Sequence, residues 1–400
     1  MRIVVVGASL GGVRTAQALR RLGHDGPLVL VDAHDRVAVD RPPLSKAYLA
    51  GDDPEPRDLL TDEQASSLGL ELVLGRPATG VDLASHEVVL ADGRLPYDRL
   101  VLACGSHPRR LGRLTDRAGV HLLRTEVDAV ALRDALARAE RVLIVGGGFI
   151  GAEVAWTAHR RGVAATIVEP LPALMVRGLG PELGQLMTER HRRLGTDVRL
   201  GVGVEDVTGE RGRLTSRLTD GETVESDLVL VGVGTVPATG WLEGSGLTIE
   251  DGVHCDSTLA AAGVPDVWAV GDVARWWHPR LEEQIRVEHW TNAVEQSGVV
   301  AKNVLGDAQA YDAMPYVWSD QLGTRLQIVG RVRPDDQVCF VVGTAHDDAF
   351  VAVTGDGEHV HAVVGAGATR ELMPYRKALV DGAGWSDVLA RSAAVSPGTP

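Results

Sequence analysis

The chain has 400 residues, of which 44% are hydrophobic and 24% are charged, and this composition is ordinary for a globular protein. Its length predicts more than one domain. The formal net charge of −14 argues against nucleic acid or an anionic membrane as a general partner. The three cysteines are widely spaced, which excludes a disulfide framework and a CxxC metal or redox motif. No apolar run is long enough to span a membrane, so we expect a cytoplasmic protein with no membrane contact. No spacing of histidines and cysteines supports a metal site, so we expect no bound metal.

The first predicted element is a buried strand at residues 2–6, which ends at a glycine turn. A helical pattern and a second apolar strand follow, and that strand ends in Asp32. The order strand, turn, helix, strand and carboxylate is typical of a dinucleotide-binding unit. Gly7, Ser9 and Gly12 occupy the GxGxxG positions, although the serine adds a β-carbon where glycine usually lets the backbone approach a pyrophosphate. We expect Asp32 to accept hydrogen bonds from ribose hydroxyls.

The same order returns in a second segment, which starts with a predicted strand at 141–145. Here the GxGxxG pattern is complete, and its candidate nucleotide contacts are Gly146, Gly148, Phe149, Ile150 and Gly151. In both segments the first glycine permits a sharp turn, and the last lets the helix pack on the strand. The helix N-terminus then presents free N–H groups to phosphate. The alternative is a pair of glycine turns that serve packing alone, but two copies that each precede a carboxylate favour nucleotide binding.

The carboxylate of the second copy is Glu169, at the end of a predicted strand at 165–169. It would bind the adenosine ribose and repel a 2′-phosphate, and the next basic residue is Arg177. We therefore expect NADH rather than NADPH, with both side chains as candidate contacts. The alternative for Glu169, as for Asp32, is an acidic strand end without a ligand.

Two further apolar strands are predicted after the second copy. The first, at 227–231, precedes a glycine pair that includes Gly234 and would let a ligand ring approach the backbone. The second, at 267–270, ends in a Gly-Asp turn at Asp272 and returns the chain to a first domain that the second interrupts. From about residue 311, alternating strands and a closing helix indicate an α+β module. The predicted fold class is therefore α/β, with two Rossmann-like dinucleotide-binding domains and a C-terminal α+β domain.

Several short motifs occur together in this chain. They are Gly-Ala-Ser-Leu-Gly-Gly at 7–12, Arg-Pro-Pro-Leu-Ser-Lys at 41–46, Gly-Gly-Gly-Phe-Ile-Gly-Ala-Glu at 146–153, Ala-Val-Gly-Asp at 269–272, Glu-His-Trp-Thr-Asn at 288–292 and Trp-Ser-Asp-Gln at 318–321. Over nearly the whole chain, this combination resembles the ferredoxin reductases of oxygenase systems, flavoproteins related to putidaredoxin reductase and biphenyl-dioxygenase reductase. The resemblance implies three domains. A glutathione-reductase-like FAD-binding domain would comprise residues 1–109 and 235–308, an inserted NADH-binding domain residues 110–234, and a C-terminal domain residues 309–400.

The resemblance also implies the reaction. In such enzymes NADH delivers hydride to FAD, and electrons then pass singly to a small acidic [2Fe–2S] ferredoxin that supplies a cytochrome P450 or a ring-hydroxylating dioxygenase. By matching motif position, the FAD contacts would be Gly11, Lys46, Ala78, Arg124, Asp272 and Trp290. Serine at position 9 is common in this family, whereas an acid at position 32 is less regular.

Lys46 and Glu153 are the candidate catalytic residues. Reduced flavin carries negative charge near N1, and Lys46 follows two prolines that predict an extended backbone able to hold a cation there. Glu153 would pair with this lysine at the contact between flavin and nicotinamide. The alternatives are a solvated loop lysine and a glutamate that compensates its helix dipole. Arg41 and Trp318 are further flavin candidates, and the alternative for Trp318, as for Trp290, is a place in the core.

Electrons are expected to leave the flavin directly, because residues 1–103 contain no cysteine, whereas related disulfide reductases carry a CxxxxC pair. The adjacent Trp276 and Trp277 cannot both face a core, so at least one is a candidate partner contact. An acidic ferredoxin would then dock on a local basic face near Arg275, Trp277, Arg280 and Arg286. The alternative for this stretch is a solvated loop.

Two other functions stay open from the sequence. One is a cysteine-free NADH-dependent reductase of rubredoxin or another small acceptor. The other is an NADH-binding flavoprotein that acts as a redox sensor.

Overall fold

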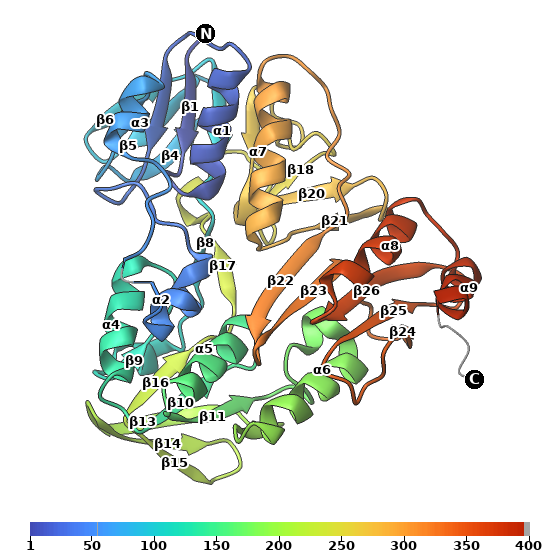
Figure 1. Ribbon diagram of the computed structural model, residues 1–400. Helices are drawn as coiled ribbons and strands as arrows, with labels where there is room; N and C mark the ends of the chain where they lie inside the picture. Colours follow the sequence, from blue (N-terminus) through green and yellow to red (C-terminus); the bar gives the residue numbers. More distant parts are fainter. Residues whose placement is uncertain (54, 396–400) are drawn as a thin grey trace. The chain divides into compact units, whose positions relative to one another are not determined.

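The computed structural model describes residues 1–53 and 55–395, and the chain divides into two compact units (Figure 1). The first unit contains residues 1–40, 56–107 and 235–313. The second unit contains residues 41–55, 108–234 and 314 onward. The three domain ranges expected from the sequence stay predictions. The short segment 41–55, which was expected within the FAD-binding domain, belongs to the second unit.

A five-stranded parallel sheet forms the centre of the first unit. Its strands, in spatial order, are β19 (Val267–Ala269), β7 (Arg99–Leu102), β1 (Ile3–Val6), β2 (Leu28–Val31) and β3 (Glu71–Val73). The middle strands β1 and β2 are runs of valine, isoleucine and leucine that are buried along their whole length, as expected for a parallel sheet covered on both faces. The predicted strand at 2–6, the predicted strand that ends in Asp32 and the predicted strand at 267–270 correspond to β1, β2 and β19.

Two long helices of the first unit, α1 (Leu10–Arg21) and α7 (Trp290–Val304), pack against each other and lie side by side in Figure 1. The Ser297 hydroxyl of α7 donates a hydrogen bond to the Gly11 carbonyl of α1 at 3.0 Å. The shorter elements of this unit are α3 (Asp62–Ser67), η3 (Gly240–Leu242), η4 (Gly271–Val273), and the antiparallel β4 (Ala78–Asp82), β5 (Glu87–Leu90) and β6 (Gly93–Pro96). A three-stranded sheet joins β18 (Val253–Cys255), β20 (Ala274–His278) and β21 (Glu283–Ile285), and β8 (Ser106–Pro108) pairs with β17 (Thr235–Pro237).

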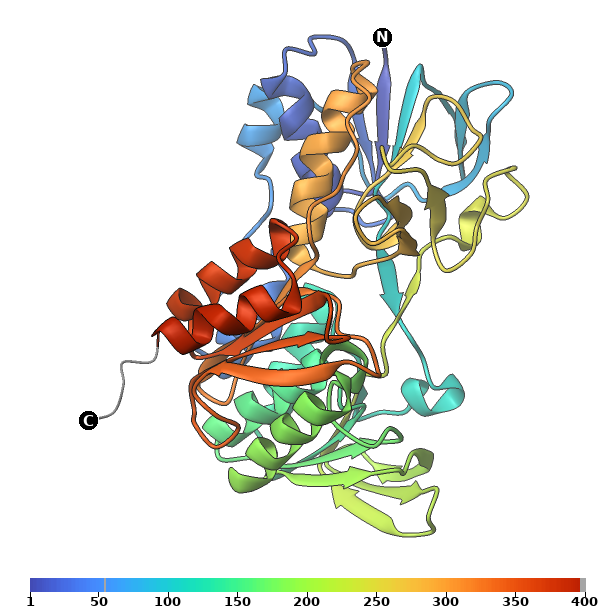
Figure 2. The ribbon, with the colours of Figure 1, turned by 90° about the vertical axis from the view of Figure 1, so that its right-hand side faces the viewer.

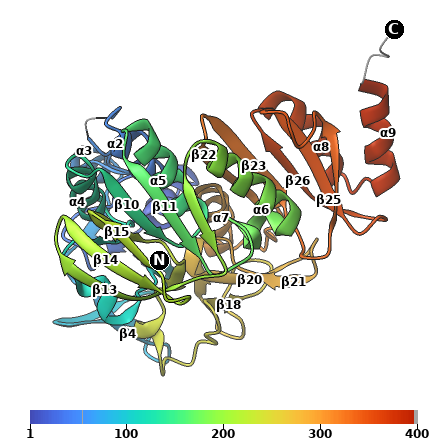
Figure 3. The same ribbon diagram turned by 90° about the horizontal axis from the view of Figure 1, so that it is seen from below.

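A second five-stranded parallel sheet forms part of the second unit. Its strands, in spatial order, are β12 (Asp197–Leu200), β11 (Ala164–Glu169), β10 (Arg141–Val145), β16 (Leu228–Val231) and β9 (Val120–His121). The helices α5 (Phe149–Arg160) and α6 (Val176–Arg193) contact this sheet (Figure 3). Further elements are η2 (Gly112–Asp116), α4 (Glu126–Leu136) and an antiparallel sheet of β13 (Val204–Glu210), β14 (Arg213–Leu218) and β15 (Thr223–Ser226).

The C-terminal part of the second unit is a five-stranded antiparallel sheet with helices on one face, coloured orange to red in Figure 2. Its strands, in spatial order, are β22 (Tyr316–Gln321), β23 (Thr324–Gly330), β26 (Val360–Ala366), β25 (Phe350–Gly355) and β24 (Gln337–Val342). The helix α8 (Thr369–Val380) supplies apolar residues to the core of this sheet, and α9 (Trp385–Val395) adds Trp385 and Val388. This is the predicted α+β module. Together with the two parallel sheets it confirms the predicted fold class.

The segment 41–55 folds along helices of the second unit. It forms the 3₁₀ helix η1 (Pro42–Ser45) and the short helix α2 (Ala47–Ala50). The extended backbone expected before Lys46 is therefore wrong. Pro42 stands at the first position of η1, where the fixed φ of proline suits a helical turn as well as an extended chain. The Thr157 hydroxyl of α5 donates to the Ser45 carbonyl at 3.0 Å and fastens the turn.

Within the described ranges, none of the helices combines the length and the apolar character needed to cross a membrane.

Candidate functional site

The two glycine turns are built in the same way. Gly7 and Gly146 have φ angles of +119° and +107°, which residues with a side chain rarely adopt. A β-carbon on Gly12 would lie 1.8 Å from the Gly7 carbonyl oxygen, and one on Gly151 would lie 2.2 Å from the Gly146 carbonyl oxygen. Each turn therefore depends on its first and last glycine for packing between strand and helix.

The middle position of the second motif, Gly148, is free of such contacts, and Ser9 is its counterpart in the first motif. Ser9 and Gly148 stand at the N-caps of α1 and α5, both in extended conformation, and neither forms a side-chain cap bond to its helix. A β-carbon on Gly148 would meet no described atom within 4 Å. Open space at an uncapped helix N-terminus fits a phosphate group of a dinucleotide.

The two strand-end carboxylates hold the glycine turns. Asp32 accepts hydrogen bonds from the N–H groups of Ala8, at 2.6 Å, and His34, at 2.8 Å. Glu169 accepts from the N–H of Gly147 at 2.7 Å, and its other oxygen accepts from the N–H of Leu171 at 2.9 Å. The sequence did not anticipate this role. Each carboxylate oxygen has further lone-pair capacity, so the proposed contact with ribose stays a prediction.

The start of α6 is also tied to the second turn. Met175, which has a positive φ of 53°, donates its N–H to the Gly147 carbonyl at 2.8 Å. The Phe149 ring lies against Gly178 in α6. Ile150 and Arg177 are exposed.

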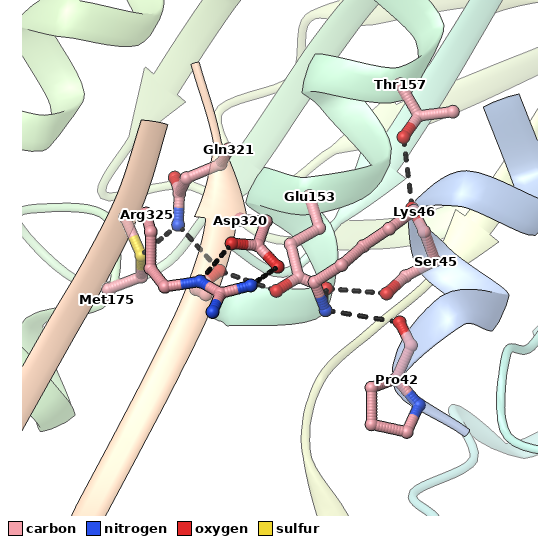
Figure 4. A network of polar contacts seen from close by, with 10 residues as sticks. Pro42, Ser45, Lys46, Glu153, Thr157, Met175, Asp320, Gln321 and Arg325 are labelled. Atoms are coloured by element: carbon pink, nitrogen blue, oxygen red, sulfur yellow. Dashed lines mark hydrogen bonds and ion pairs between the residues drawn. The ribbon is translucent and has the colours of Figure 1, made fainter. Parts of the chain in front are cut away.

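An ion pair between the buried Glu153 and the partly buried Lys46 lies in the second unit (Figure 4). Glu153 on α5 is 4% exposed, and one of its oxygens accepts from Lys46 Nζ at 2.8 Å and from Ser45 Oγ at 2.5 Å. Its other oxygen accepts from Ser319 Oγ of β22 at 2.6 Å. Lys46 Nζ also donates to the Pro42 carbonyl at 3.3 Å. The ion pair expected between Lys46 and Glu153 is therefore present, and two serine hydroxyls that were not among the predicted site residues also donate to Glu153.

A second layer of buried polar groups lies behind this pair. Gln321 Nε2 is 3.0 Å from Ser319 Oγ and 3.4 Å from Met175 Sδ, and its carbonyl oxygen is 2.9 Å from His191 Nε2. Burial lowers the pKa of His191, so its imidazole is neutral near pH 7. The Trp-Ser-Asp-Gln motif could have indicated this group of polar side chains in the sequence, because alternation along a strand places Ser319 and Gln321 on one face.

The remaining flavin candidates divide between the two units. In the first unit, Asp272 accepts from the Ser106 hydroxyl at 2.8 Å, and Trp290 Nε1 donates to Asp40 at 2.8 Å. Of the twelve flavin candidates in all, eight lie in the first unit, namely Gly7, Ser9, Gly11, Gly12, Asp32, Ala78, Asp272 and Trp290. The second unit contains Arg41, Lys46, Arg124 and Trp318, and all the nicotinamide-dinucleotide candidates.

In the second unit, Arg41 begins η1, and Arg124 donates its backbone N–H to Asp128 at 3.1 Å. Trp318 on β22 stacks with Tyr316. The Gly234 carbonyl accepts from the Arg109 N–H at 2.9 Å.

The adjacent tryptophans of β20 point to opposite sides of the strand. Trp276 is fully buried, whereas Trp277 is 43% exposed, which agrees with the expectation that they cannot both face the core. The neighbouring arginines form ion pairs, Arg275 with Glu250, Arg280 with Asp312, and Arg286 with Asp251 and Glu288. The expected basic face thus has its positive charges matched by acids.

All three cysteines are free thiols. Burial raises the pKa of Cys104 to about 11 and also raises that of Cys255, so neither forms a thiolate near pH 7. In the described part of the chain, no group of His, Cys, Asp and Glu side chains is arranged to hold a metal ion.

Two Rossmann-like units with such glycine turns define a class of dinucleotide-dependent oxidoreductases. The family model described as pyridine nucleotide-disulphide oxidoreductase matches residues 1–297, and the chain belongs to this family. A second model, described as reductase C-terminal, matches residues 316–396.

Relatives match over almost the full chain. The chain is 36% identical over 386 residues to the 5,5'-dehydrodivanillate O-demethylase ferredoxin reductase subunit of Sphingobium sp., with 95% of this chain and 93% of that protein covered. It is 32% identical over 370 residues to putidaredoxin reductase CamA of Pseudomonas putida, with 90% and 87% covered. A solved covalent complex of putidaredoxin reductase and putidaredoxin matches with a TM-score of 0.92 at 28% identity, with 99% and 98% covered.

These comparisons confirm the family resemblance and the predicted class of enzyme, a flavoprotein oxidoreductase. They also confirm the expected cofactors, FAD with a nicotinamide dinucleotide as electron donor. The roles of individual residues toward these cofactors stay predictions.

Proposed function

We propose that this chain transfers electrons from NADH, through FAD, to a small acidic [2Fe–2S] ferredoxin that supplies a cytochrome P450 or a ring-hydroxylating dioxygenase. The observation that carries the proposal is the full-length similarity to ferredoxin reductases, which includes the C-terminal sheet as well as the nucleotide-binding part. When bound, FAD accepts a hydride and releases electrons one at a time. The three cysteines are isolated free thiols, so the chain has no disulfide to relay electrons in pairs.

We assign the binding of FAD to the twelve flavin candidates, which include the first glycine turn. We assign the binding of NADH to the second glycine turn with Glu169, Arg177 and Gly234. The free backbone N–H groups of each uncapped helix N-terminus would hold a pyrophosphate. Glu169 places negative charge beside the second turn, which disfavours the 2′-phosphate of NADPH.

Lys46 and Glu153 are proposed to act at the contact of flavin and nicotinamide. The carboxylate holds the ammonium group at 2.8 Å, and the prolines before it limit the freedom of the backbone. A cation fixed in this way stabilises negative charge that develops near it, at a lower reorganisation cost than a mobile lysine.

For the partner, we propose docking near Trp277, with Arg275, Arg280 and Arg286 around it. Trp277 is the exposed aromatic residue of this strand. Because the arginines are already paired with acids, the attraction to an acidic ferredoxin would come from exchange of those ion pairs rather than from free positive charge. A cytoplasmic location is part of the same proposal.

An anaerobic titration of the FAD-loaded protein with NADH and then NADPH tests the donor. We expect NADH to bleach the flavin absorbance at lower concentration than NADPH. Turnover with cytochrome c is then measured with and without a [2Fe–2S] ferredoxin. Strong dependence on the ferredoxin supports the proposal, whereas equal turnover without it favours a reductase of rubredoxin or another small acceptor. Slow NADH oxidation with a long-lived charge-transfer absorbance would favour a redox sensor.

A further inference from the structure

We propose that Ser319 is a positioning residue for Glu153 and that Gln321 and His191 fix the direction in which its hydroxyl donates. The C-terminal sheet would then set the geometry of the Lys46–Glu153 pair. This inference rests on the proposed role of that pair in flavin reduction by NADH.

Glu153, Ser319, Gln321 and His191 form one continuous series of buried hydrogen bonds, and Figure 4 labels Glu153 and Gln321. Ser319, Gln321 and His191 are 1% exposed or less. Ser319 and Gln321 are two positions apart on β22 and therefore point to the same side. This strand packs against α5, which carries Glu153, so the contact joins the C-terminal sheet to the helix of the nucleotide-binding turn.

The direction of each hydrogen bond follows from the chemistry of the donors. A carbonyl oxygen accepts only, so His191 Nε2, at 2.9 Å from Gln321 Oε1, carries the proton. The amide nitrogen of Gln321 donates only, so the oxygen of Ser319 accepts at 3.0 Å. The Ser319 hydroxyl proton is then left for the Glu153 carboxylate at 2.6 Å.

His191 can act as a fixed end of this chain because it is neutral. Burial lowers its pKa, and its Nδ1 has no hydrogen-bond partner within the described residues. The neutral imidazole therefore presents one N–H, and that N–H faces Gln321. Gln321 Nε2 also has Met175 Sδ as a second acceptor at 3.4 Å, so this orientation of the amide gives both its nitrogen and its oxygen a partner.

Ser319 donates to the carboxylate oxygen of Glu153 that Lys46 does not contact. Lys46 and Ser45 both donate to one oxygen of Glu153, and Ser319 donates to the other. Without the Ser319 hydroxyl, that second oxygen would be buried without this donor, which is costly for a charged group. The carboxylate would turn toward the remaining donors and move the ammonium group with it.

The test uses the FAD-loaded full-length protein and stopped-flow reduction by NADH under anaerobic conditions. We expect Ser319→Ala to lower the limiting rate of flavin reduction about 10-fold, because misplacement of a reacting group costs rate more than binding. The NADH concentration that gives half the limiting rate should change less than about twofold. Ser319→Thr, which keeps a hydroxyl, should restore most of the rate, and Gln321→Met should lower it in the same direction.

Thr354→Val is the matched control. Thr354 is also a buried hydroxyl of the C-terminal sheet, and it donates at 3.1 Å to the carboxylate of Asp336, whose side chain is 3% exposed. This variant should lose thermal stability but keep the limiting rate. Equal rates in Ser319→Ala and the unmodified protein would overturn the inference, as would equal slowing in Ser319→Thr or Thr354→Val.

The experiment distinguishes a failure of the role of Ser319 from a failure of the proposed electron transfer from NADH to FAD. If NADH reduces the unmodified protein quickly and Ser319→Ala is equally fast, only the positioning role is lost. If NADH does not reduce the unmodified protein, the proposed function fails and the role of Ser319 fails with it.

Discussion

Two glycines three positions apart in the second turn carry different constraints. A β-carbon on Gly151 would lie 2.2 Å from a backbone oxygen, whereas one on Gly148 would meet nothing within 4 Å. Packing of the protein itself therefore explains Gly151 but leaves Gly148 unexplained. We propose that a dinucleotide approaches the backbone at position 148, which would explain why glycine stands there.

This contrast leads to a paired prediction. Gly151→Ala should destabilise the second unit by several kcal/mol on the scale of overpacking, lowering the thermal midpoint and the yield of folded protein. Gly148→Ala should melt within a few degrees of the unmodified protein but bind NADH about 10-fold more weakly, as measured by the NADH dependence of flavin reduction. Normal NADH affinity in a folded Gly148→Ala variant would contradict the assignment of this turn.

At the same scale, Glu153 is expected to control the rate of flavin reduction. Glu153→Ala removes the partner of Lys46 and should slow reduction by NADH about 10- to 100-fold while FAD stays bound, as followed by stopped-flow absorbance. Asp52→Asn is a suitable control. Asp52 belongs to segment 41–55, as Lys46 does, and forms an ion pair with Arg160 of α5, but this pair is at the surface, where ion pairs contribute little to stability. Unchanged reduction rates in Glu153→Ala would contradict the proposed role.

At the scale of single elements, the strand β20 separates core from surface by alternation. Trp276 is buried, and Trp277 on the opposite side is exposed. An exposed tryptophan is a common anchor in protein interfaces because it buries a large area with little loss of entropy.

Trp277→Ala should therefore raise the KM for ferredoxin about 10-fold while the rate of flavin reduction by NADH stays the same. Leu22→Ala, which removes a similarly exposed apolar side chain from the same unit, should change neither quantity. Steady-state cytochrome c reduction with varied ferredoxin distinguishes the two. A Trp277 variant with unchanged KM would place the docking surface elsewhere.

Elements also show what the sequence could and could not predict. The strands β1, β2, β10 and β16 were predictable because continuous runs of valine, isoleucine and leucine are typical of a buried parallel sheet. The turn η1 was not, since the preferred φ of proline fits both an extended chain and a first helical turn.

The polar network behind Glu153 was the hardest part of the site to predict. Ser319, Gln321 and His191 lie far from Glu153 in the sequence and belong to other elements. Their residue types are common in loops and on surfaces, and only the packing of β22 against α5 brings them together. The pair Lys46–Glu153 was expected through the family resemblance, because no local pattern joins residues that far apart.

At the scale of the whole molecule, buried and half-buried histidines couple stability to pH. Desolvation is the largest cause that lowers the pKa of His24, His121, His191 and His278. A histidine with a lower pKa in the folded chain binds more protons when unfolded, so the free energy of unfolding falls as pH drops below the unfolded value of about 6.5. Each such group contributes up to about 1.4 kcal/mol per pH unit in that window.

We therefore expect the thermal midpoint to decrease between pH 7 and pH 5 and to change little between pH 7 and pH 8, as measured by differential scanning calorimetry. His191→Leu should show a smaller decrease between pH 7 and pH 5 than the unmodified protein, whatever its absolute midpoint. A midpoint that rises on acidification in this range would contradict the prediction.

The alternation of the two units along the chain has a consequence for biosynthesis. The polypeptide passes from one unit to the other at residues 40, 55, 107, 234 and 313. The edge strand β19 and helix α7 of the first unit are made only after all five strands of the second unit's parallel sheet. A ribosome must therefore translate about three quarters of the message before the first unit has all its parts. During that time the apolar strands β1 and β2 lack neighbouring elements that bury them in the folded unit. Nascent chains with such exposed apolar segments are typically bound by chaperones.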